Sequence, residues 1–101
     1  MENIVKDIID VIEDKKGLDI RVYDLKGKSP FFDYSIICTG SSTRNVDAIV
    51  QDLKKNMEIV RNIEGQEESN WVLIDGGDVI VNVFTKESRE YYEIDKFYES
   101  I

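Results

Sequence analysis

The segment with the residue types best suited to catalysis is a Gly-Ser turn at residues 39 to 42, Thr-Gly-Ser-Ser. It follows an apolar stretch that reads as a strand and precedes a stretch with helical periodicity. Free backbone N–H groups at a helix N-terminus can hold a phosphate or a carboxylate. The turn could therefore bind the phosphate of a nucleotide.

A strand that leads through Gly-Ser into a helix resembles the opening motif of nucleotidyltransferase-like folds. Those enzymes also need paired carboxylates on a nearby strand to hold Mg²⁺. No Asp-x-Asp or Asp-x-Glu pair lies on a predicted strand after this helix, and the next acidic residues, Glu64, Glu67 and Glu68, fall in a predicted loop. The sequence therefore favours an ordinary turn capped by Ser or Thr, with a small nucleotidyltransferase as the alternative.

The remaining reactive side chains have ordinary structural explanations. The chain has no histidine that could lower the pKa of the Cys38 thiol and so activate it as a nucleophile. A buried structural thiol is therefore favoured. Asp75 and Asp78 flank a Gly-Gly pair, where aspartate usually bonds the local backbone of a turn rather than acting as acid and base. We therefore predict no catalytic residue, no metal site and no cofactor, and expect a protein that is not an enzyme.

Aromatic and polar residues near the C-terminus are better candidates for a binding surface. Trp71 is the only tryptophan and follows a polar loop, so it could anchor either the core or an interface. Asn82 interrupts an apolar strand and must find a hydrogen-bond partner or face outward. Arg89 and Tyr92 lie on the last predicted helix, where they could pack on the strands or extend the surface.

Charge and composition narrow the choice of partner. The 101 residues include 13 basic and 21 acidic side chains, a net charge of −8. Such a surface repels nucleic acid and suits a basic protein, although it could also serve solubility alone. The longest apolar run has four residues, the first seven residues include acids, and there is one cysteine. We therefore expect no membrane span, no secretory signal peptide and a cytoplasmic location.

The elements that must position these residues follow from periodicity. Helices are predicted over residues 2 to 15 and 85 to 92, with a short tail at 94 to 98, and an apolar stripe from Val46 to Val60 predicts another. Alternation predicts strands at 18 to 25, 31 to 39, 71 to 75 and 79 to 84, and residues 61 to 70 are a predicted loop. The order α-β-β-α-β-β-α over one domain, 1–101, predicts an α+β fold or α/β sandwich. We expect this fold to have a mixed four-stranded sheet with flanking helices. The second and third strands could be joined by a parallel crossover.

Five segments together resemble the Iojap family, the bacterial ribosomal silencing factors. They are residues 14 to 20 (DKKGLDI), 33 to 40 (DYSIICTG), 40 to 44 (GSSTR), 71 to 81 (WVLIDGGDVIV) and 89 to 92 (REYY). The resemblance spans roughly residues 3 to 98 and keeps the family's order and spacing.

The resemblance implies a nucleotidyltransferase-like fold without known catalytic activity. It implies a translational repressor that binds the large ribosomal subunit through the fourteenth protein of its naming series and obstructs joining of the small subunit when nutrients are scarce. Direct nucleic-acid binding is not expected, and a free homodimer is implied. A role in large-subunit assembly would use the same docking surface and stays open.

The resemblance also carries over a set of partner-binding residues. The family's contact surface centres on the tryptophan and the acidic hairpin, and its final helix has an Arg-Glu-Tyr-Tyr motif. Where this chain has Asn82, the family commonly has histidine, so any role that needs a titrating group there is absent. The positions that match are Trp71, Asp75, Gly77, Asp78, Val81, Asn82, Arg89 and Tyr92.

Overall fold

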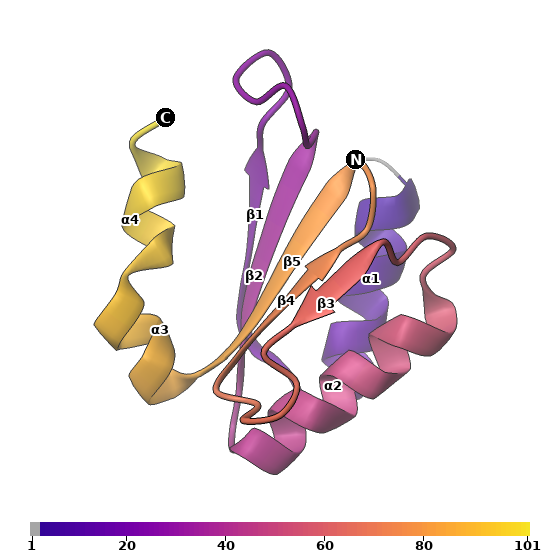
Figure 1. Cartoon of the computed structure of the whole chain (residues 1–101), viewed down its shortest axis with the longest axis vertical. Helices are drawn as coiled ribbons and strands as arrows, with labels where there is room; N and C mark the ends of the chain where they lie inside the picture. The colour runs from indigo at the N-terminus through magenta and orange to yellow at the C-terminus, as the bar shows by residue number, and fades with distance from the viewer. Residues whose placement is uncertain (1–2) are drawn as a thin grey trace.

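The computed structural model describes residues 3–101 and has a single mixed sheet with helices on both faces (Figure 1). The strands lie in the order β1-β2-β5-β4-β3. The predicted α+β class, a mixed sheet flanked by helices, is confirmed. In chain order the elements are α1 (Asn3–Asp14), β1 (Leu18–Asp24), β2 (Tyr34–Gly40), α2 (Thr43–Asn56), β3 (Asn62–Glu64), β4 (Trp71–Asp75), β5 (Val79–Thr85), α3 (Lys86–Tyr92) and α4 (Ile94–Glu99).

Helices α1 and α2 cover one face of the sheet and form the main core with it (Figure 1). Both are amphipathic, because apolar residues recur every three or four positions and so gather on one side of a helix. In α1 the buried residues are Val5, Ile8 and Ile12. In α2 the buried stripe ends at Leu53, and the helix stops at Asn56, earlier than the predicted stripe to Val60. Met57 already has an extended backbone, and Val60 is exposed.

The parallel pair in the sheet is β2 and β5. The sequence suggested a parallel crossover between the second and third predicted strands, which are β2 and β4. β2 pairs with β5 in parallel, whereas β4 pairs with β5 in an antiparallel hairpin. The third predicted strand, β4, therefore runs against β2, because the hairpin reverses direction and places β5 beside β2. Every residue of β2 is buried, as is typical of a strand covered on both faces.

The sheet has five strands rather than four. The predicted loop at residues 61 to 70 contains β3, whose three residues pair antiparallel with β4. Three residues are too few to show an alternating pattern, and only Ile63 packs against the core. An edge strand this short and this polar has no recognisable sequence signature, so the strand count was underpredicted.

Helices α3 and α4 pack on the opposite face (Figure 1). Thr85 caps α3 as predicted, with its hydroxyl accepting a hydrogen bond from the Ser88 N–H. Glu93 adopts a left-handed conformation (φ 54°), which separates the two helices. The predicted tail at 94 to 98 is thus a helix of its own.

Candidate partner-binding surface around Trp71

Trp71 lies at the start of β4 and is half-buried on the face that carries α3. Val72 and Ile74 alternate with it and point into the core under α1 and α2. Its ring stacks on Phe84 and contacts Tyr92, with centroids 5.1 Å and 4.7 Å away. The side chain is thus a packed aromatic that keeps part of its surface open to solvent.

Asn82 fixes the orientation of this ring. The indole N–H of Trp71 donates to Oδ1 of Asn82 at 2.8 Å, and Asn82 is only 2% exposed. Of the two outcomes that the sequence left open for this residue, the structure shows the hydrogen-bonded one. The pair allows a polar side chain to sit on a buried strand, since its oxygen is satisfied.

An open groove borders Trp71 and carries acidic residues. The loop that leads into β4 forms one side, and α3 contributes Ser88 and Tyr92. Glu67 and Glu68 line the groove and are exposed. Tyr91 is 80% exposed and packs edge-on against Tyr92, so the aromatic surface continues along α3.

The hairpin residues lie at the far end of the same strand. Oδ1 of Asp75 accepts a hydrogen bond from the Gly77 N–H at 3.0 Å, and Gly77 has a φ of 87°. This is the local turn geometry expected for aspartate beside glycine. Asp78 is exposed. Asp75 lies four positions along the strand from Trp71, about 13 Å at the usual rise, so the predicted site divides into two clusters on one hairpin.

Besides Asn82, two of the predicted contact residues, Val81 and Arg89, are buried and need a revised role. Val81 is fully buried beneath α1 and α2, because its strand parity points it into the core. Arg89 is 8% exposed and is occupied by internal bonds. Neither side chain is available to contact a partner directly in this structure.

Arg89 connects the C-terminal helices to the sheet. Its guanidinium makes two hydrogen bonds to the Asp95 carboxylate, at 2.8 Å and 3.0 Å. Its third nitrogen donates to the Asp19 backbone oxygen at 2.7 Å and to Thr39 Oγ1 at 2.9 Å. Asp19 has a φ of 48° at the irregularity of β1, which aims its carbonyl at the arginine. A bidentate pair of this kind is strong and directional.

Asp95 and Tyr23 complete this network, and sequence reasoning missed both. The Tyr23 hydroxyl donates to Oδ1 of Asp95 at 2.8 Å. The hydrogen bond from Arg89, against the opposing effect of burial, lowers the pKa of Asp95. Burial together with the bond to Asp95 raises the pKa of Tyr23. Residues 72 positions apart have no common local pattern, so no sequence signal joined them.

The Gly-Ser turn has the structural role that the sequence favoured. Ser42 caps α2 by accepting from the Asn45 N–H, and Asn45 in turn accepts from the Ser41 N–H at 2.9 Å. A Cβ at Gly40 would collide with Val46, so close packing explains the glycine. Cys38 is buried, as predicted, and burial raises its thiol pKa to about 12.

Two further structural facts bear on the site. Across residues 3–101, no group of three or more His, Cys, Asp or Glu side chains is placed to hold a metal ion. None of the helices in that range is long and apolar enough to cross a membrane.

Comparison with known proteins places the chain among ribosome-associated factors. The model of the family described as "Ribosomal silencing factor during starvation" matches residues 1–101. A ribosomal silencing factor RsfS of Bacillus subtilis is 39% identical, covering 96% of this chain and 86% of its own. The RsfS of Halalkalibacterium halodurans is 41% identical over 89% of this chain and 80% of its own.

A solved structure has the same fold. The crystal structure of a protein from Chromobacterium violaceum superposes with a TM-score of 0.90 at 36% identity, covering 98% of this chain and 88% of that one. A more distant relative from mouse, 26% identical over 90% of this chain and 43% of its own length, is named a mitochondrial assembly of ribosomal large subunit protein. The sequence, the fold and the match over all 101 residues agree: the chain belongs to the RsfS family of ribosomal silencing factors.

Proposed function

We propose that this chain is a translational repressor that binds the large ribosomal subunit and sterically blocks joining of the small subunit. The contact on the ribosome is the fourteenth protein of the large-subunit series. The chain acts in the cytoplasm, without catalysis, without direct nucleic-acid contact, and as a homodimer when free. Membership of the silencing-factor family supports this proposal.

The observation that carries the proposal is the state of Trp71. It is held by Asn82, Phe84 and Tyr92 yet remains partly open beside an acidic groove. A tryptophan fixed before binding loses little conformational entropy on docking, which makes it an efficient interface anchor. Acidic residues beside it attract a basic protein and repel the surrounding RNA backbone.

The predicted contact residues take two roles in this proposal. Trp71 and Tyr92 form one contact, and Asp75, Gly77 and Asp78 form the other, about 13 Å along the hairpin. A standard interface buries about 800 Å² on each partner, which is enough to include both clusters. Val81, Asn82 and Arg89 support this surface from beneath, since all three are buried.

A sucrose gradient with separated ribosomal subunits tests the proposal. We expect the protein to sediment with the large subunit and to reduce the amount of joined ribosomes. Trp71→Ala should lose both effects while remaining folded. Phe97→Ala is the matched control, because Phe97 is an aromatic residue that is 62% exposed on α4, and its neighbour Tyr98 stacks on Tyr23 of β1, the edge strand opposite to β4 and β3. Absence of binding at about 10 μM protein, above the Kd of a weak specific contact, would refute the ribosomal interface.

A role in assembly of the large subunit is the second candidate. The name of the mouse relative favours it. The same gradient separates the two roles, because an assembly factor would bind the large subunit without reducing subunit joining.

A further inference from the structure

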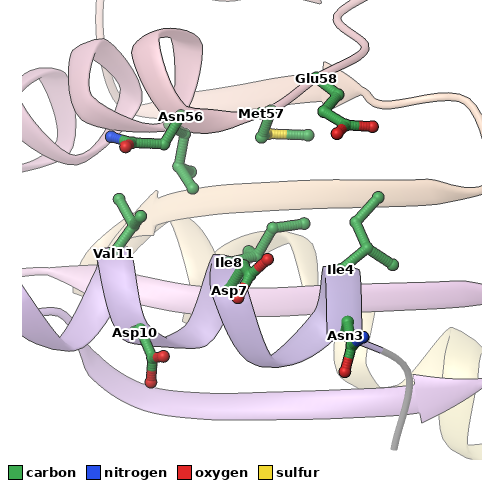
Figure 2. A pocket seen from close by; sticks show the side chains of 10 residues that line it. Asn3, Ile4, Asp7, Ile8, Asp10, Val11, Asn56, Met57 and Glu58 are labelled. Carbon is green, nitrogen blue, oxygen red and sulfur yellow. The ribbon is translucent and has the colours of Figure 1, made fainter.

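A second groove lies between α1 and the end of α2 (Figure 2). It encloses about 480 Å³. Ile4, Ile8 and Val11 line it from α1, and Figure 2 shows Ile4 and Val11 directed toward the end of α2. Leu53 and Met57 line the opposite side. The floor of the groove is therefore apolar, although side chains on both helices already pack against the core.

The polar residues around this floor are acidic or uncharged. Asp7, Asp10 and Glu58 are its charged lining residues, and no Lys or Arg lines it. Asp10 is paired with Lys6 at 2.8 Å, whereas within residues 3–101 neither Asp7 nor Glu58 takes part in an ion pair.

We propose that this groove binds a short, basic, amphipathic helix of a partner protein. Apolar side chains of that helix would occupy the floor, and its Lys or Arg residues would lie against Asp7 and Glu58. The row from Ile4 to Val11 is about 10 Å long, which equals two turns of helix. An occupant with apolar residues at i, i+3 or i+4, and i+7 matches that length.

Charge favours a basic helix over two other possible occupants, a second copy of this chain and a nucleic acid. A symmetric contact between two copies would bring the same patch of each chain together, and so place Asp7 and Glu58 of both copies in one interface. Nucleic acid would meet the same repulsion from its phosphates. A basic helix instead gains both apolar burial and attraction to the rim.

The groove lies on the other side of the sheet from Trp71. Helices α1 and α2 cover one face of the sheet, and α3 and α4 lie on the other (Figure 1). Val72 and Ile74 pack in the core under α1 and α2, whereas the Trp71 ring contacts Tyr92 of α3. Both surfaces can therefore be occupied at once. The chain could link a second protein to whatever Trp71 contacts, and this inference does not depend on the identity of that contact.

A synthetic helix can test the groove in the free protein. The probe is a labelled 14-residue amphipathic peptide with Leu at i, i+3 and i+7 and Lys elsewhere, and its control carries Glu in place of Lys. Fluorescence anisotropy should show binding of the Lys peptide only. Amide NMR shifts should concentrate on Asp7, Val11 and Met57, while the single indole signal of Trp71 stays unchanged.

Charge variants locate the binding on one face. Asp7→Asn with Glu58→Gln should raise the Kd of the Lys peptide about fivefold, the order expected for two exposed charges. Glu67→Gln with Glu68→Gln removes the same charge beside Trp71 and should leave the Kd unchanged. The proposal fails if the second pair weakens binding instead, if the Trp71 signal shifts, or if both peptides bind equally. It also fails if sedimentation shows that wild type self-associates and that the Asp7 and Glu58 changes alter its mass, because a second copy would then cover the groove.

Discussion

The indole N–H of Trp71 and the side-chain oxygen of Asn82 are joined by a 2.8 Å hydrogen bond across the β4–β5 hairpin. The bond satisfies a nearly buried amide and, in the same contact, fixes the plane of the ring. The Phe84 ring stacks on the same indole, and the Tyr92 ring contacts it at a tilt. The proposed anchor is therefore rigid because a core residue orients it, which links the stability of the sheet to recognition.

Removing the acceptor should destabilise the protein. Asn82→Leu leaves the half-buried indole N–H without a partner, and we expect a loss of about 1 to 2 kcal/mol. Urea unfolding measures it, with Asn62→Leu as the control. Asn62 is exposed on the edge strand and its side chain donates to exposed Glu64, so the substitution should cost less than about 0.5 kcal/mol. Equal losses in the two variants would show that the Trp71 bond contributes nothing.

Histidine at the same position should introduce a pH dependence. The wild-type chain has no histidine, and neutral imidazole can still accept from Trp71. Protonated imidazole cannot, so burial and the indole would lower the folded pKa of the new side chain below its unfolded value of about 6.5. Asn82→His should therefore match wild type near pH 8 and lose stability as pH falls below about 6.5. Parallel pH profiles for the two proteins would contradict this.

Truncating the anchor should weaken binding to the large subunit. We expect Trp71→Ala to lose about 2 kcal/mol or more, roughly a 30-fold rise in Kd. Titration of labelled protein against large subunits measures it, with Phe97→Ala as the control. An unchanged Kd in a folded Trp71 variant, confirmed by circular dichroism, would remove this residue from the interface.

The helical layer and the central strands were predictable because each is long enough to show its period. The stripe that includes Val46 and Leu53 is such a case, and both residues are fully buried. The edge strand β3 was not predictable, because three residues with one apolar member have no period. The pairing of β2 with β5 was also missed. A strand followed by a crossover helix does not reveal which of the later strands, β4 or β5, pairs with β2.

Some of the candidate residues that the sequence grouped lie together in the structure, but the sequence did not show which of them are buried. Trp71, Asn82 and Tyr92 meet as one cluster, and all three were among the residues that the sequence proposed for a binding surface. Arg89 was expected on a binding surface, but it is buried and bonded to Asp95. Asp95 lies six residues later, in a segment that was predicted only as a short tail. Long-range hydrogen bonds of this kind depend on the full tertiary structure.

The bond between Arg89 and Asp95 should give stability that acid removes. Because Arg89 lowers the folded pKa of Asp95, the contribution is complete above the unfolded value of about 3.9 and is lost as pH falls through the folded value. Asp95→Asn should cost about 1 to 2 kcal/mol at pH 7, and its difference from wild type should shrink below about pH 4. Thermal unfolding from pH 7 to pH 3 measures the difference. Asp14→Asn, an exposed change in α1, should show no such convergence.

Two glycines that both have a positive φ angle should respond differently to substitution by alanine. Gly65 and Gly27 have φ values of 88° and 77°, so either substitution forces an L-residue into the left-handed region at a cost of about 1 kcal/mol. A Cβ at Gly65 would also collide with the backbone oxygen of Trp71, whereas nothing lies within 4 Å of one at Gly27.

Gly65→Ala should therefore lose clearly more stability than Gly27→Ala, and it should also displace the start of β4. Because Trp71 is that first residue, only Gly65→Ala should shift the tryptophan emission and raise the Kd for the large subunit. Equal stability losses with unchanged emission in both would mean that the loop yields without moving Trp71. The position of the anchor would then not depend on the glycine turn that precedes it.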